Sequence, residues 1–584
     1  MLRSTLRRPR LKTALLACAF GLALAGPGTA FAQSATPGAQ VDSRALLELM
    51  VNKGLVTRAE ADALLAQATV APPQQQAAVP AGGVSGDTQT IPYIPQTVRN
   101  QIRDEIRTEL ANQATAEGWA RPGEVAEWTK RITVFGDLRV RGEGTFMDEG
   151  NFGLAFPNFG AINAGPGYDI SPSNPNAAPF LNSTEDRQSA RIRARLGVRA
   201  QIDSWIGAEI RLATGNDRAP VSTNQNLGAN GEFGKYAVWL DRANIRLTPT
   251  KGVDLVFGRF ANPFWTSEIL FDEDINFDGL AASVHAPIGD HLNVFANAGA
   301  FPIFNTDFNF GSNEAGAFSS KDKYLFAGQI GAEFKPTDTV AVQLAAGYFR
   351  FDKVQGQTSS PCFFDQDVCD TDATRPQFMQ FGNSLFPIRD VIPDPLDPVG
   401  SPEIQYYGLA SKYEVLNVHG RLDYTGFGSI GVRLEGDYVK NLGFDRNLVS
   451  ARAINNLGPG AEVPNPNQDN DPDTDDATIY NPGPWAGGDT GWMASLTVGK
   501  PDMVNVGDWR VSLGYRWVES DAVLDAFADS DFHLGGTNAK GWTIGGGYTF
   551  GKNTAIGARW LSSDSITGIP FSNDIIQIDL TTKF

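Results

Sequence analysis

The chain contains 584 residues, and its 66 Asp and Glu outnumber its 48 Lys and Arg, which gives a formal net charge of −18 at pH 7. So acidic a protein is unsuited to binding nucleic acid, because the phosphate backbone would repel it. After its N-terminal segment the sequence has no apolar run long enough for a membrane-spanning helix, so any crossing of a membrane must use a closed β-barrel.

Residues 1–32 have the three parts of a secretory signal peptide. Five basic residues precede an apolar run from Thr13 to Ala25, and Ala30-Phe31-Ala32 is a small-x-small cleavage site. The apolar run is shorter than the roughly 20 residues that a membrane span needs, so an anchor helix is the weaker alternative. Cleavage after Ala32 would leave 43 basic against 66 acidic residues, a net charge of −23. We expect export from the cytoplasm.

Residues 33–129 are expected to form a periplasmic helical segment. The spacing of apolar residues between Val41 and Ala68 predicts a helical hairpin, and a Pro-, Gln- and Gly-rich linker follows at 72–86. The next helix repeats an apolar residue every four positions, which fits either a coiled coil or an amphipathic helix on the rim of a barrel. These apolar residues are Val98, Ile102, Ile106 and Leu110.

From residue 130 to 584 the sequence predicts an all-β fold, a transmembrane antiparallel β-barrel of about 16 strands. Short turns are expected at 203–204, 249–252, 288–290, 336–338, 426–428, 501–507 and 551–553. Long connections are expected at 148–184, 215–235, 261–276, 303–322, 353–411, 442–488, 520–540 and 565–572. Seven short and eight long connections in strict alternation imply sixteen strands with both ends on the short-turn side, as bacterial outer-membrane barrels require.

The predicted strands have one polar and one apolar face. At 190–202, 430–438 and 509–517, charged or polar residues alternate with aliphatic or aromatic ones. These faces predict a lipid-covered outside and an aqueous lumen. Six aromatic residues fall near strand ends, where a membrane barrel has its interfacial girdles: Trp509, Trp517, Trp542, Tyr548, Phe550 and Trp560.

Arginines at inward positions of the first strands would form a basic wall in this lumen. A guanidinium stays charged and binds carboxylate or phosphate in a fork, so the wall could pass anions along. The alternative is that the arginines pair with Glu143, Glu209 and loop acids and brace the wall. The wall residues are Arg139, Arg141, Arg191, Arg193, Arg195, Arg199, Arg211, Arg242 and Arg246.

The third long connection is the natural candidate for a constriction. Residues 262–278 read NPFWTSEILFDEDINFD, and their acids could face the basic wall across the pore. These acids are Glu268, Asp272, Glu273 and Asp274. The alternatives are that this segment is a surface loop and that 353–411 plugs the barrel.

Two other loops have residues that could carry chemistry. Cys362 and Cys369 lie close together in an exported chain, which predicts a disulfide rather than a metal pair. The alternating Asp residues at 469–476 lack the Gly and Glu of an EF-hand at Thr474 and Tyr480, which favours a solvated loop over weak divalent binding. We expect no metal and no cofactor.

The last strand, 573–584, is expected to close the barrel against residues near 132–140. Alternate residues of this strand are apolar and would face lipid: Ile576, Ile578, Leu580 and Phe584. Gln577, Asp579 and Lys583 would face water. An aromatic last residue on such a strand resembles the C-terminal signal that the barrel assembly machinery reads, so Phe584 is the predicted assembly signal.

An enzyme is not expected. The four histidines lie on separate predicted strands and loops, and none has a nucleophile motif beside it. They are His285, His291, His419 and His533.

Several stretches resemble the proteobacterial "putative porin" family. They are LLELMVNKGLVTRAEADALLAQA within 41–70 and, within 130–290, DRQSARIRARLGVRAQI, LDRANIRLTPTKGVDLVFGRFANPFW and DEDINFDGLAASVHAP. Members of this family are taken to be outer-membrane channels, so the resemblance implies passive transport and names no solute.

We therefore expect an outer-membrane porin of a Gram-negative bacterium that lets small hydrophilic solutes or ions diffuse passively, with a preference for anions. Its partners would be outer-membrane lipid, lipopolysaccharide, the barrel assembly machinery and the solutes, and analogy with general porins suggests a homotrimer. The alternative is a structural or adhesive barrel whose loops bind partners and whose lumen is plugged.

Overall fold

The computed structural model describes residues 103–106, 108–109, 127–307, 319–458, 461–464, 478–481 and 483–584. The predicted signal peptide, most of the predicted periplasmic segment and the acidic run at 469–476 lie outside these residues. Within the described part of the chain, no helix has both the length and the apolar character needed to cross a membrane.

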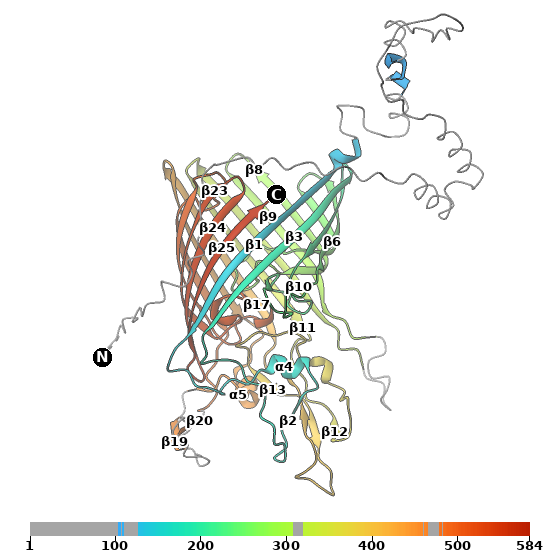
Figure 1. Cartoon of the computed structure of the whole chain (residues 1–584), viewed down its shortest axis with the longest axis vertical. Helices are drawn as coiled ribbons and strands as arrows, with labels where there is room; N and C mark the ends of the chain where they lie inside the picture. The colour runs from blue at the N-terminus through green and yellow to red at the C-terminus, as the bar shows by residue number, and fades with distance from the viewer. Residues whose placement is uncertain are drawn as a thin grey trace, which may run out of the picture. The chain divides into compact units, whose positions relative to one another are not determined.

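Sixteen long antiparallel strands form a closed barrel, as the sequence predicts (Figure 1). Consecutive strands pair with each other, and β1 pairs with β25 from Asp137 opposite Lys583 to Met147 opposite Asn573. The sheet therefore has no free edge. The strands are β1 (Ile132–Met147), β3 (Arg187–Asp203), β4 (Ile206–Ala213), β6 (Trp239–Thr250), β7 (Val253–Ala261), β8 (Asn276–Ile288), β9 (Leu292–Phe304), β10 (Lys323–Thr337), β11 (Val340–Asp352), β17 (Tyr413–Phe427), β18 (Ile430–Asn441), β21 (Thr490–Gly499), β22 (Trp509–Val518), β23 (Ala539–Gly551), β24 (Thr554–Ser565) and β25 (Ser572–Lys583).

Shorter elements lie outside this set of strands. The strands are β2 (Tyr168–Asp169), β5 (Gln225–Asn226), β12 (Pro361–Phe363), β13 (Leu385–Pro387), β14 (Asp390–Ile392), β15 (Ile404–Gln405), β16 (Tyr407–Leu409), β19 (Ala461–Pro464) and β20 (Thr478–Asn481). The helices are η1 (Glu127–Arg131), α4 (Phe159–Ala164), η2 (Asp372–Thr374), α5 (Arg446–Arg452), η3 (Asp525–Phe527) and η4 (Phe532–Leu534). Of these, β5 pairs with β3 and so extends the barrel sheet.

The connections sort onto the two ends of the barrel as predicted. All seven short turns lie at one end, and the eight long connections lie at the other, which is the extracellular end of an outer-membrane barrel (Figure 1). Tight turns need residues that accept positive φ, such as Gly428 at 73° and Asn553 at 59°. The long connections are called L1 (148–186), L2 (214–238), L3 (262–275), L4 (305–322), L5 (353–412), L6 (442–489), L7 (519–538) and L8 (566–571).

The outer surface of the barrel is apolar, as the strand faces predict. Leu196 of β3 is 52% exposed on this surface, whereas Arg193 of the same strand points inward and is 8% exposed. The same alternation exposes Leu434 of β18 and Val511 of β22. In water these side chains would have to be covered, and lipid covers them without a second protein layer.

An apolar cluster that the sequence did not predict occupies the extracellular half of the barrel. It joins inward side chains of β7 to β11, β17, β18 and β22 to residues of L3, L5 and L7. Phe349 of β11 lies at its centre, with the rings of Phe264 and Phe271 of L3 edge-on at 5.1 and 5.4 Å. Burying each such ring contributes roughly 2 kcal/mol. The lumen is therefore filled on this side and polar on the side of β1 and β3.

L5 is held together within itself. Cys362 and Cys369 form a disulfide, as the sequence predicts. The guanidinium of Arg389 pairs with Asp372, and both side chains are buried. Removing one partner of such a pair costs about 3–5 kcal/mol, so this long loop has a defined conformation.

Candidate functional site

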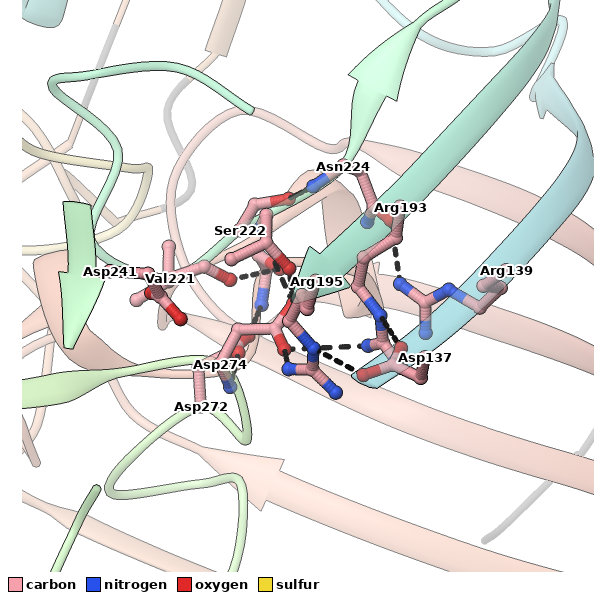
Figure 2. Close-up of polar contacts among 12 residues, drawn as sticks. Asp137, Arg139, Arg193, Arg195, Val221, Ser222, Asn224, Asp241, Asp272 and Asp274 are labelled. Atoms are coloured by element: carbon pink, nitrogen blue, oxygen red, sulfur yellow. Dashed lines mark hydrogen bonds and ion pairs between the residues drawn. The ribbon is translucent and has the colours of Figure 1, made fainter. Parts of the chain in front are cut away.

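The candidate site is the level of the lumen at which loop acids meet the arginines of β1 and β3 (Figure 2). Strand alternation puts Arg139 and Arg141 on the inward face of β1, directly opposite Arg193 and Arg191 of β3. Like charges opposite each other destabilise a sheet, so this wall needs anions between its cations.

Two carboxylates supply most of that negative charge. Asp137 accepts hydrogen bonds from Arg193 Nε at 2.9 Å and from Arg195 Nε at 2.6 Å. Asp274 of L3 faces the same two side chains, with Arg195 Nη1 at 2.9 Å and Arg193 Nη1 at 3.4 Å (Figure 2). Thr223 of L2 donates its hydroxyl to the other oxygen of Asp274. The four charged side chains are nearly buried, so removal of any one of them would leave a buried charge without its partner.

L3 runs inside the barrel because backbone and side-chain contacts hold it there. Trp265 N donates to Gln329 Oε1 of β10 at 2.9 Å, and Gln329 Nε2 donates back to the carbonyl of Trp265 at 2.8 Å. Ser267 N donates to Asp437 of β18 at 3.0 Å. The Trp265 ring lies edge-on to His419 of β17, 4.1 Å away. These contacts fix one side of L3, while Asp274 fixes the other.

L7 lies across the lumen beside L3. Asp272 N donates to the carbonyl of Phe527 at 2.8 Å, and Ser530 N donates to the Asp272 carboxyl at 2.9 Å. Asp529 N donates to the carbonyl of Glu268 at 2.9 Å. Burial, followed by the nearby charge of Asp529, raises the pKa of Asp272 to about 8. Asp272 is therefore mostly protonated at neutral pH.

The acids of L7 are site residues that the sequence did not reveal. Asp529 pairs with Arg516 of β22 at 2.6 Å. Asp531 pairs with Arg141 of β1 at 2.8 Å and with Arg559 of β24. Burial alone would raise the pKa of Asp531, but Arg559 and Arg141 outweigh it and hold the pKa well below its ordinary value. Strand alternation marks the inward arginines, whereas an irregular loop has no periodic signal.

Most predicted wall arginines have carboxylate partners. Besides the pairs above, Arg191 contacts Glu143 at 2.8 Å, Arg199 and Arg242 contact Glu209 at 2.7 and 3.3 Å, Arg211 contacts Asp241, and Arg246 contacts Asp254 at 3.8 Å. Arg139 differs, because within the described residues its partner is the amide oxygen of Asn224 at 2.6 Å. The wall therefore combines bracing ion pairs with one arginine whose charge has no directly bonded carboxylate.

The four predicted constriction acids have different environments. Asp272 and Asp274 are buried, and Asp274 pairs with the wall as described above. Glu268 lies 3.5 Å from Arg516, and the charge of Asp529, together with burial, raises the pKa of Glu268 well above the ordinary value. Glu273 is exposed. Three of the four thus hold loops together or face the wall, and the fourth, Glu273, is exposed.

The sequence matches the family model described as "Putative porin" over residues 41–584. The chain belongs to this family. The match extends past the stretches in which the resemblance was expected to be best and includes the whole barrel. Together with the closed sixteen-stranded fold, it makes this protein an outer-membrane porin channel of the Gram-negative type.

Several solved structures are similar to this porin over 78% of its length. OprB of Pseudomonas putida at high pH has 12% identity, a TM-score of 0.38 and 95% of its own chain covered. A loop L8 deletion mutant of OmpT, an outer membrane protein of Vibrio cholerae, has 11% identity, a TM-score of 0.34 and 99% covered. The outer membrane channel DcaP of Acinetobacter baumannii has 10% identity, a TM-score of 0.33 and 97% covered. No curated protein sequence matches the chain.

Proposed function

We propose that this porin mediates passive diffusion of small hydrophilic solutes or ions, with a preference for anions. The observation that supports it is the arrangement of Asp137, Arg193, Arg195 and Asp274, where a loop inside the lumen faces the wall with fixed charges. Opposed fixed charges create a local field that orders water and favours dipolar solutes over apolar ones.

The solute path is proposed along the wall of β21 to β24. Besides Arg510, Arg516 and Arg559, the inward positions of these strands carry small or hydroxyl side chains, including Ser495, Thr497, Ser512, Gly545 and Gly557. Such residues leave space and offer hydrogen bonds to water. This sector, on the turn side of the constriction, is the proposed solute path.

The proposed anion preference rests on arginines that remain accessible. Arg139 has no directly bonded carboxylate among the described residues, and the side chains of Arg199 and Arg246 are 56% and 58% exposed towards the turn side. The net charge of −23 expected after cleavage of the signal peptide acts in the opposite direction at the mouths. The charge inside the lumen should dominate, because salt screens partly buried charges less than exposed ones.

Planar bilayers containing the purified, folded porin test this function. We expect step conductances, and in a salt gradient a reversal potential of the sign that anions produce. A reversal potential of the opposite sign would overturn the anion preference while leaving passive diffusion intact.

The second candidate function is a structural or adhesive barrel with a plugged lumen. It is favoured by the apolar cluster of L3, L5 and L7 and by the ion pairs through which L7 crosses the lumen. In this case the same bilayers would show no conductance, although the protein is folded. That result would replace the diffusion proposal.

We also propose that the barrel forms a homotrimer in contact with lipopolysaccharide and is inserted by the barrel assembly machinery. Small residues support close contact between protomers on the lipid-facing side: Gly420, Gly436 and Ala494 lie side by side on β17, β18 and β21. They line an outer groove of about 630 Å³.

A further inference from the structure

Aromatic side chains line the lumen towards the turn end of the barrel, on the inward faces of β8 and β9. His285 and Phe295 lie directly opposite each other on these two strands. Their ring planes are 22° apart and their centroids are 6.1 Å apart. At that separation the rings are displaced sideways, so they form one nearly continuous surface. Trp265 of L3 stands edge-on to Phe295 at 6.4 Å and bounds this surface.

A glycine lets the Phe295 ring lie flat against the wall. A Cβ on residue 331 of the neighbouring strand β10 would clash with this ring, so the ring lies across Gly331 with one face against the strand. Phe295 is half-buried and His285 is exposed. The other ring face is therefore turned towards the lumen, where a solute can pack on it.

A row of polar side chains lies beside the aromatic surface, one inward position closer to the turns. The register of five neighbouring strands puts these residues directly opposite one another. They are Asn293 of β9, Glu333 of β10, Gln343 of β11, Arg421 of β17 and Glu435 of β18.

Two side chains of this row keep a polar atom open to the lumen. Gln343 accepts a hydrogen bond from Arg421 Nη2 at 2.7 Å through its oxygen, and Glu435 Oε1 lies 3.0 Å from His419 Nε2. The remaining atoms, Gln343 Nε2 and Glu435 Oε2, have no hydrogen-bond partner among the described residues, and both are reached by water. Asn293 is exposed as a whole. The row therefore offers both donors and acceptors to a solute.

The charges of the row are balanced by partners beside it. Glu333 lies 3.0 Å from Lys335 Nζ, and Arg421 Nε lies 3.3 Å from Asp423. The row thus presents hydrogen-bonding groups with little net charge. An open aromatic face beside such groups suits a neutral solute that has an apolar face and many hydroxyls.

We propose that this face of the lumen binds a neutral saccharide of two or three rings. The C–H face of one sugar ring packs on Phe295 and His285, because C–H groups carry the partial positive charge that an aromatic face attracts. Hydroxyls of the next ring accept from Gln343 Nε2 and donate to Glu435 Oε2. β9 and β11 are two strand spacings apart, about 10 Å, which a single sugar ring does not bridge. The inference rests on the proposed function, because it names one class of the small hydrophilic solutes.

Saturation-transfer difference NMR of the full-length porin tests the site directly. Micelles of lauryldimethylamine oxide are suitable, because this detergent carries no sugar. The probes are maltose and mannitol, which has hydroxyls but no rigid ring with a C–H face. We expect maltose to bind about tenfold more tightly than mannitol, because only maltose can pack a preformed face on Phe295.

Three variants assign the contacts. Phe295→Leu should weaken maltose binding about tenfold, because it removes the ring and keeps an apolar side chain. Phe295→Tyr should keep the affinity within about twofold, since the ring remains. Gln343→Leu should weaken maltose binding about tenfold, because a sugar hydroxyl loses its donor. This last variant leaves the aromatic surface intact and tests the site even if Phe295→Leu fails to fold.

Phe135→Leu is the matched control. Phe135 of β1 also lies across a glycine of the neighbouring strand, Gly197 of β3. Its ring face is already covered by the guanidinium of Arg199, 4.1 Å from the ring centroid. Removal of this ring should therefore leave maltose binding unchanged.

Equal affinities for maltose and mannitol would overturn the proposal, as would the absence of saturation transfer from wild-type porin to maltose. Unchanged maltose affinity in either Phe295→Leu or Gln343→Leu would overturn it as well. Failure of the proposed function is a separate result, because it is the absence of conductance in bilayers and leaves these affinities unaffected.

Discussion

Arg141 and Arg139 stand two residues apart on β1, yet their environments give them different roles. Arg141 is 1% exposed and holds Asp531 at 2.8 Å and Asp579 at 2.7 Å. Loss of one partner from such a buried group costs about 3–5 kcal/mol, so Arg141 stabilises the fold. Arg139 faces an amide instead and lies closer to solvent. Its charge is the one most able to act on a passing ion.

Arg139→Gln should therefore shift ion selectivity and leave the barrel folded. We expect the anion-to-cation permeability ratio to fall on the order of twofold, since the lumen loses one arginine charge that has no directly bonded carboxylate. Reversal potentials in a salt gradient measure this. Arg350→Gln is the matched control, because Arg350 is an outward arginine of β11 paired with Asp352. An unchanged ratio in the first variant would show that Arg139 does not contribute to selectivity.

At the scale of elements, L3 and L7 behave as one unit inside the barrel. They are joined through Asp272 by the amide of Ser530 and the carbonyl of Phe527. L3 is also fixed to β10 and β18, and L7 is fixed to β1, β22 and β24. A loop held at so many points keeps its charges in place during passage of a solute.

The contact that L3 and L7 make through Asp272 should weaken as the pH rises. Because burial and Asp529 raise the pKa of Asp272 to about 8, its protonated form is favoured in the folded state. The stability that it contributes is present below the ordinary carboxyl pKa and is lost as the pH rises through 8. We expect hydrogen exchange in 262–275 and 519–538 to accelerate from about pH 5 to pH 8 and to level off above pH 8, after correction for intrinsic exchange.

Asp272→Asn should abolish that acceleration, because an amide does not ionise. Asp217→Asn, an exposed acid of L2, should leave it unchanged. Identical pH profiles of hydrogen exchange in wild-type and Asp272→Asn porin would show that another group controls the contact between L3 and L7.

At the scale of the whole molecule, one seam between the first and last barrel strands, β1 and β25, closes the barrel. Gly136 N donates to the carbonyl of Phe584 at 3.0 Å, and Phe584 N donates to the carbonyl of Gly136 at 3.0 Å. A Cβ on residue 136 would clash with the backbone carbonyl of Arg195 on β3 and would lie 2.6 Å from the Phe584 ring, so glycine is needed where the last side chain covers the seam. The Phe584 ring is 58% exposed on the outer surface, as its parity predicts.

Deletion of Phe584 should impair membrane insertion more than selectivity, because the seam loses its last pair of backbone bonds and the terminal aromatic. The amount of heat-modifiable porin in outer-membrane fractions measures insertion, and bilayer recordings of the remainder measure selectivity. Phe550→Ala removes another exposed aromatic near the turn end and serves as the control. Normal insertion of the truncated chain would count against an assembly role for Phe584.

The sequence by itself determined the barrel. Period-two alternation and the alternating lengths of the connections are local patterns, so they predicted sixteen strands, the two faces, the turn positions and the pairing of the last strand with the first. The same alternation placed the nine wall arginines at inward positions. The disulfide between Cys362 and Cys369 was also predictable, because the two residues are near each other in the chain.

Only the tertiary structure decided what the lumen contains. Several partners of the arginines lie far away in the chain, as Asp274 does from Arg195 and Asp531 from Arg141, and no local pattern relates them, whereas the partners Glu143 and Glu209 were predicted from the sequence. The position of L7 inside the lumen and the apolar cluster with Phe349 at its centre were missed for the same reason. Inward parity shows that a side chain points to the lumen, but whether it meets water, an opposite charge or an apolar loop depends on how the long connections fold back into the barrel.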